Sequence, residues 1–68
     1  MENKFKEVFK SLRTEKHLGQ VELSKEIGVS SGIISMWENG KREPNMESLI
    51  MIAEYFGVTI DYLVGREN

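Results

Sequence analysis

Three residues near the middle of the chain, Asn39, Lys41 and Arg42, have the types and spacing that suit phosphate binding. Lysine and arginine supply cations, and backbone N–H groups beside them can donate to phosphate oxygens. Glu43 follows directly and weakens the positive field, so a loop with merely solvated charges is the alternative. We also expect Gln20, at the start of a helix, to donate its amide to a phosphate together with the helix-end N–H groups, although a solvated residue would look the same.

The residues just before this segment are a mixture of small polar and apolar types. On a helix lying in the major groove of DNA, hydroxyl groups could bond base edges or phosphates, a glycine permits close backbone approach, and apolar side chains contact thymine methyl groups. No Arg, Asn or Gln is available there for a bidentate base contact, so ordinary surface residues are an equal alternative. The candidates are Ser30, Ser31, Gly32, Ser35 and Met36, with Ile33 at the margin.

The chain offers little other chemistry. It has no cysteine and one histidine, His17, which argues against disulfides, thiolate zinc sites and paired histidine ligands. No serine has a positioned base and no glycine-rich phosphate loop is present. We therefore expect no enzyme, metal, cofactor or small-molecule ligand. No stretch approaches the roughly 20 apolar residues of a membrane span and no signal peptide is recognisable, so we expect a cytoplasmic protein.

The charge distribution bears on nucleic-acid binding. A net charge of −2 at pH 7 argues mildly against binding by bulk attraction. Residues 1–16 carry five basic and three acidic side chains, whereas residues 47–68 carry one and four. The acidity is therefore concentrated in the C-terminal third, away from the candidate site.

The 68 residues predict one all-α domain over 1–68, a compact five-helix bundle with a frayed tail over 66–68. Apolar periodicity predicts helices over about 3–16, 20–27, 30–38, 45–56 and 60–64. The expected N-caps are Asn3, Gly19, Ser30, Asn45 and Thr59.

The second and third of these helices, within residues 20–39, form a helix-turn-helix pattern. Gly28 stands where the chain must turn sharply, and the small Ser24 stands where the helices approach each other. The second helix of such a pair lies in the major groove. The apolar positions that face a common core are Leu23, Ile27, Val29, Ile34 and Trp37.

The remaining large apolar residues predict the core. The spacing of Trp37 from Ile34 favours burial over stacking on a base. We expect the fourth helix to supply the largest block, and the methionines and tyrosines near it to fill the core and the interface with the fifth helix rather than a ligand pocket. These two sets are Leu49, Ile50, Ile52, Ala53 and Phe56, and Met46, Met51, Tyr55 and Tyr62.

A family resemblance extends over about residues 5–65. The residues that carry it are Leu12-Arg13, Gln20 with Glu22-Leu23-Ser24, Gly28-Val29-Ser30, the run from Ile34 to Pro44, Gly57-Val58 and Asp61-Tyr62-Leu63. In this combination the chain resembles the phage repressor and Cro-like, or XRE, helix-turn-helix family. The resemblance implies a lambda-repressor-like domain that binds operator DNA and represses or autoregulates transcription.

The family also implies roles for particular residues. Family members use the matching glutamine, Gln20, on the DNA backbone, and contact bases from positions matching Ser31, Gly32 and Met36. Arg13 and Glu38 match a pair that commonly forms a buried or half-buried ion pair. The fifth helix is the dimer surface in several relatives, which makes Ile60, Leu63 and Val64 candidate dimer contacts, although they could equally close the monomer core.

The sequence therefore favours a homodimer on double-stranded, palindromic operator DNA. The main alternative is a helix-turn-helix scaffold that binds protein, such as an antitoxin or antirepressor-like partner, through Ile33 and Met36. A third interpretation is the N-terminal DNA-binding part of a longer repressor.

Overall fold

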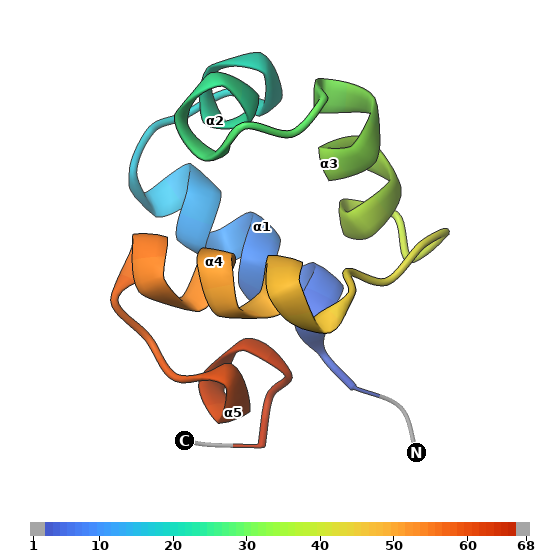
Figure 1. Cartoon of the computed structure of the whole chain (residues 1–68), viewed down its shortest axis with the longest axis vertical. Coiled ribbons are helices and arrows are strands. Elements are labelled where there is room, and N and C mark those ends of the chain that lie inside the picture. Colours follow the sequence, from blue (N-terminus) through green and yellow to red (C-terminus); the bar gives the residue numbers. More distant parts are fainter. Residues whose placement is uncertain (1–2, 67–68) are drawn as a thin grey trace.

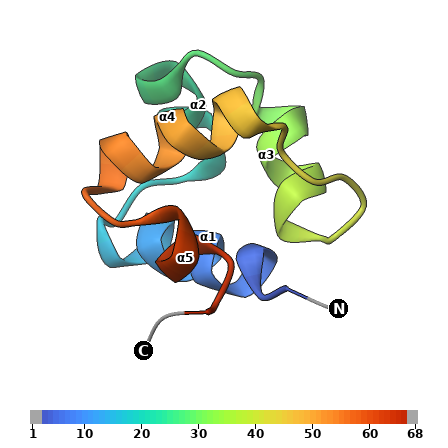
Figure 2. The same ribbon diagram turned by 60° about the horizontal axis from the view of Figure 1, so that its bottom comes forward.

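The computed structural model describes residues 3–66, and within this range the chain forms five α-helices and no strand. α2 lies at the opposite end of the molecule from α5, and α3 packs against α1 and α2 (Figure 1, Figure 2). The predicted all-α, five-helix fold is confirmed. The helices are α1 (Phe5–Glu15), α2 (Gln20–Ile27), α3 (Ser31–Glu38), α4 (Met46–Phe56) and α5 (Ile60–Leu63).

Helix starts follow the predicted capping residues closely. α3, α4 and α5 each begin after a side-chain oxygen that accepts a hydrogen bond from the backbone N–H three residues later, which satisfies one of the free N–H groups of the helix end. The caps are Ser30, Asn45 and Thr59, with distances of 3.1, 2.8 and 3.0 Å. α1 differs, because its N-cap is Lys4 rather than Asn3. The Asn3 Oδ1 atom instead accepts from the N–H of Phe5 at 3.0 Å.

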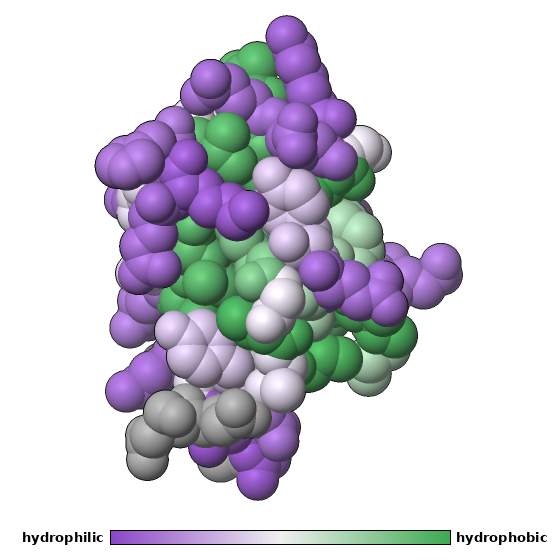
Figure 3. All heavy atoms as spheres, turned by 90° about the vertical axis from the view of Figure 1, so that its left-hand side faces the viewer, coloured by the Kyte–Doolittle hydropathy of each residue, from purple (hydrophilic) through white to green (hydrophobic). Residues whose placement is uncertain are grey.

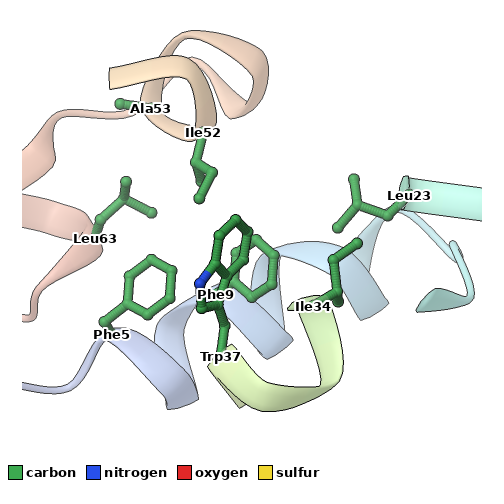
Figure 4. Packing of buried hydrophobic residues seen from close by; sticks show 8 residues of the cluster. All are labelled: Phe5, Phe9, Leu23, Ile34, Trp37, Ile52, Ala53 and Leu63. Carbon is green, nitrogen blue, oxygen red and sulfur yellow. The ribbon is translucent and has the colours of Figure 1, made fainter. Parts of the chain in front are cut away.

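One cluster of buried side chains, to which all five helices contribute, holds the fold together (Figure 4). Trp37 is buried in it and meets Phe9 edge-on, with ring centroids 5.7 Å apart. Such an aromatic pair contributes about 0.5–1.5 kcal/mol beyond its buried area. The predicted core position of Trp37 is thus confirmed. The buried members are Phe5, Phe9, Leu23, Ile34, Trp37, Ile52, Ala53 and Leu63.

The prediction was wrong for three apolar residues in and after α4. Ile50 and Met46 are 44% and 64% exposed, and Tyr62 is also exposed, whereas Met51 and Tyr55 do pack against the core. Ile50 and Met46 are one turn apart on α4, on a face outside the buried stripe that is formed at positions 49, 52, 53 and 56. Hydrophobic atoms are also open to solvent on the side of the molecule seen in Figure 3.

The C-terminal end shows small departures from expectation. α5 ends at Leu63, and Val64 is its C-cap. The N–H of Arg66 donates to the carbonyl of Asp61 at 2.9 Å, so the first residue of the expected frayed tail is held. Residues 67–68, the rest of that tail, lie outside the described residues. Among residues 3–66, no helix has both the length and the apolar character needed to cross a bilayer.

Candidate nucleic-acid interface

The turn between α2 and α3 sets the angle of the two helices. Gly28 ends α2 with a φ of 76°, a left-handed conformation that costs a glycine little. Its N–H donates to the carbonyl of Ser24 at 2.9 Å. Ser24 is buried between the helices and turns its hydroxyl back to the carbonyl of Val21 at 2.6 Å, so a small polar residue fits there without an unsatisfied group. Leu23 and Ile34 are fully buried, which directs the opposite face of α3 outward.

The outer face of α3 carries the residues predicted to contact bases. Gly32 is exposed, Met36 is 42% exposed, and Ser31 and Ser35 are half-buried. Ile33 packs partly against the core, so it is less available to a partner than its type suggested. The hydroxyl oxygens of two candidates accept hydrogen bonds within the chain: that of Ser30 accepts the cap hydrogen bond, and that of Ser35 accepts from the Asn39 amide at 3.3 Å.

The segment after α3 gathers cations, as predicted. Lys41 and Arg42 are exposed, and the N–H of Lys41 donates to the carbonyl of Met36 at 3.0 Å, which closes the end of the helix. Cations at this position also complement the negative end of the helix dipole, which is a purely structural reason for their presence. The carboxylate of Glu43 accepts from the Asn3 amide at 2.9 Å and so has a partner other than these cations.

Lys6 is a candidate that sequence reasoning missed. Its aliphatic chain and ammonium group lie beside Gly40, where an added Cβ atom would be 3.1 Å from Lys6 Cδ and 3.4 Å from Nζ. Lys6 and Arg42 line one cleft of about 280 Å³ together with Trp37. A third cation, from α1, therefore lies beside the segment that was predicted to bind phosphate. Nothing in the sequence signals this, because 34 positions separate Lys6 from Gly40.

Arg13 and Glu38 form a buried ion pair that joins α1 to the end of α3. The Arg13 Nε and Nη2 atoms donate to the two Glu38 carboxylate oxygens at 2.6 and 2.9 Å, and Nη1 donates to the carbonyl of Leu18 at 2.7 Å. The Glu38 side chain is only 3% exposed. Hydrogen bonding to Glu38 raises the pKa of Arg13, and burial opposes that rise. The bidentate geometry fixes the direction of both side chains.

Gln20 belongs to the same network, which the sequence did not indicate. Its Nε2 atom donates to Glu38 Oε1 at 3.1 Å, so the first residue of α2 is tied to the last residue of α3. A primary amide has two N–H groups, and this contact uses one of them. The second remains for the phosphate that Gln20 was predicted to bind.

The expected dimer contacts need one correction. Leu63 is fully buried within the single chain, because it closes the core between α5 and the other helices. It therefore has no side-chain surface to offer a second copy. Ile60 packs partly against the core, and Val64 is half-buried.

Comparison with known proteins places this geometry in a family. A helix-turn-helix family model matches residues 9–63. The transcriptional activator BcrR of Enterococcus faecalis is 48% identical over 64 residues, an alignment that covers 94% of this chain and 31% of that protein. The chain thus spans about a third of this relative.

Solved structures agree with the sequence comparison. A transcriptional regulator from Listeria innocua matches with a TM-score of 0.89 at 28% identity, covering all of this chain and 64% of that one. The P22 c2 repressor, in complex with a synthetic operator, matches with a TM-score of 0.84 at 32% identity, covering 93% and 96%. The predicted resemblance is confirmed: the chain belongs to the helix-turn-helix family of phage repressors and transcriptional regulators.

Proposed function

We propose that this chain is the DNA-binding unit of a transcriptional regulator, most simply a repressor that occupies an operator and blocks transcription. The observation that carries the proposal is the arrangement around α3. Its outer face is open, and three cations, Lys6, Lys41 and Arg42, gather at its C-terminal end. An open helix flanked by phosphate-binding groups is what entry into a major groove requires.

Each end of the proposed interface has its own phosphate contacts. At the start of α2, the second N–H of the Gln20 amide would hold one phosphate, together with N–H groups of the first helical turn other than that of Gly19, which donates to the Glu22 carboxylate at 2.7 Å. Beyond α3, Lys41, Arg42 and Asn39 would hold another, with Lys6 beside them. These contacts position α3 but do not distinguish sequences.

The base contacts would come from Ser31, Gly32, Ser35 and Met36. None can form the bidentate hydrogen bonds that discriminate most strongly, so one copy discriminates weakly between sequences. We therefore propose a homodimer on a palindromic site, with the two copies of α3 about 34 Å apart. Ile60 and Val64 remain candidate dimer contacts. Because operator DNA lies in the cytoplasm of bacteria, we propose a cytoplasmic protein.

A fluorescence-anisotropy titration tests this function. The protein is titrated against duplex DNA from upstream of its own gene and against a scrambled duplex, each at low and moderate salt. Tighter binding to the upstream duplex, weakening steeply with salt as counterions are released, supports an operator-binding regulator. Equally weak binding to both contradicts it and favours the protein-binding scaffold. Sedimentation of the complex then gives the number of chains per site.

A further inference from the structure

Glu43 places a carboxylate among the cations at the C-terminal end of α3. It follows Arg42 in the chain, and it lines the same cleft of about 280 Å³ as Lys6 and Arg42. A carboxylate in this place competes with phosphates, because a cation that pairs with it is less available to DNA. Among residues 3–66, however, Glu43 forms no ion pair with any cation. Some other contact therefore holds its side chain.

Asn3 holds this carboxylate with a neutral group. Its Nδ2 atom donates to Glu43 Oε2 at 2.9 Å, across 40 positions of sequence. Because the donor is an amide rather than an ammonium or a guanidinium, the contact uses no cation. Lys6 and Arg42 are both exposed and so can meet phosphates.

Two backbone contacts fix the place from which the Asn3 amide reaches out. Asn3 Oδ1 accepts from the N–H of Phe5 at 3.0 Å, which orients the amide. The N–H of the next residue, Lys4, donates to the carbonyl of Val64 at 2.9 Å and ties this segment to the end of α5. An aspartate could accept from Phe5 equally well, but it would repel Glu43. The asparagine amide serves both contacts, one through its oxygen and the other through its nitrogen.

We propose that Asn3 is a positioning residue for DNA binding, which holds the Glu43 carboxylate away from Lys6 and Arg42 so that both cations are open to phosphates. This inference rests on the proposed DNA-binding function and adds a residue that acts on it through Glu43. Phosphate contacts carry no sequence information, so the contribution of Asn3 is the same for every duplex. An exposed ion pair is screened by salt, so the contribution is largest at low salt.

Asn3→Ser separates this role from the contact with α1. Serine keeps a side-chain oxygen for the N–H of Phe5 but lacks the amide that reaches Glu43. The substitution leaves the net charge unchanged, so the long-range attraction of DNA is the same. The freed carboxylate pairs with Lys6 or Arg42, and the affinity for duplex DNA falls by about two- to fivefold for each bound chain at low salt. Because Asn3 is exposed, the melting temperature changes little.

The test is a double-mutant cycle with Glu43→Gln. When the carboxylate at position 43 is gone, Asn3→Ser releases no competing charge, so it leaves the affinity of the Glu43→Gln chain unchanged. Glu54→Gln is the matched control, since it removes an exposed carboxylate near the other end of α4. Asn3→Ser keeps its full effect in that background. Each chain is titrated by fluorescence anisotropy against the upstream and the scrambled duplex, at low and moderate salt, and is melted without DNA.

The outcomes are distinguishable. A loss that Glu43→Gln abolishes, with the same factor on both duplexes and a smaller factor at moderate salt, supports the inference. A loss of equal size with and without Glu43→Gln means that Asn3 acts through the structure of α1, and it overturns the inference. No loss in a folded Asn3→Ser chain overturns it as well, and both results leave the proposed function standing. Equally weak binding of the parent chain to both duplexes contradicts the proposed function and the inference with it.

Discussion

The two ends of α3 differ in how strongly contacts within the chain hold them in place. Its C-terminal end carries Glu38, a nearly buried carboxylate that accepts hydrogen bonds from Arg13 and Gln20. Its N-terminal end carries Gly32, which is exposed and has open space around it. The first end fixes where the helix lies, and the second leaves a surface that the fold does not constrain. Residues at the free end can therefore change without refolding the domain, which suits a scaffold that recognises different sites.

The largest expected effect comes from breaking the Arg13–Glu38 ion pair at the C-terminal end of α3. Arg13→Met or Glu38→Leu leaves a buried charge without its partner, and each should lower the free energy of unfolding by about 3–5 kcal/mol. Replacing both by apolar residues, as in Arg13→Met with Glu38→Leu, should cost less than either single change because no charge remains to be desolvated. Urea unfolding of the four proteins measures this cycle. Simple additivity of the two single changes would show that the pair does not act as a unit.

The next largest effect concerns DNA affinity rather than stability. Lys41→Ala with Arg42→Ala removes two proposed phosphate contacts from each chain. For each bound chain, the slope of log K against log salt should therefore fall by about 2 and the affinity at 0.15 M salt by about thirtyfold. Both side chains are exposed, so the unfolding free energy should change by less than about 0.5 kcal/mol. Arg66→Ala removes an exposed cation outside the interface and is the control. An unchanged slope in the double variant would mean that the two cations interact with the helix dipole and not with phosphates.

A smaller effect tests the hydrogen bond between Gln20 at the start of α2 and Glu38 at the end of α3. Gln20→Glu sets a second carboxylate against Glu38, whereas Gln20→Met only removes the 3.1 Å hydrogen bond. We expect the glutamate variant to lose about 1–2 kcal/mol of unfolding free energy and the methionine variant about 1 kcal/mol or less. Thermal and urea unfolding rank the two. Equal stability of both variants would mean that Gln20 and Glu38 are not coupled in solution.

The parts of this fold that sequence could predict are those with local causes. Ser30, Asn45 and Thr59 cap helices that begin at the next residue, and Gly28 ends α2 by a conformation that glycine tolerates best. Each such signal depends on residues within one turn of the chain. Helix positions and turns were therefore predicted to within a residue or two.

The errors and omissions have non-local causes. α4 is apolar over much of its circumference, so its sequence does not show which stripe is buried, and Ile50 was assigned to the core although it is exposed. The approach of Lys6 to Gly40 and the bond from Gln20 to Glu38 join residues far apart in sequence. From the sequence alone, Leu63 could belong to the core of one chain or to a dimer interface. Its complete burial within the single chain assigns it to the core.

The smallest effect separates capping from DNA contact at Ser30, where the free end of α3 begins. Ser30→Ala removes the oxygen that accepts from the N–H of Ile33 and should cost about 1 kcal/mol of unfolding free energy. Ser30→Asp keeps an acceptor, and its charge suits a helix N-terminus, so stability should be retained. The same charge would repel phosphates. If Ser30 lies at the interface, the aspartate variant is as stable as the parent chain but binds duplex DNA much more weakly, whereas intact binding would limit Ser30 to capping.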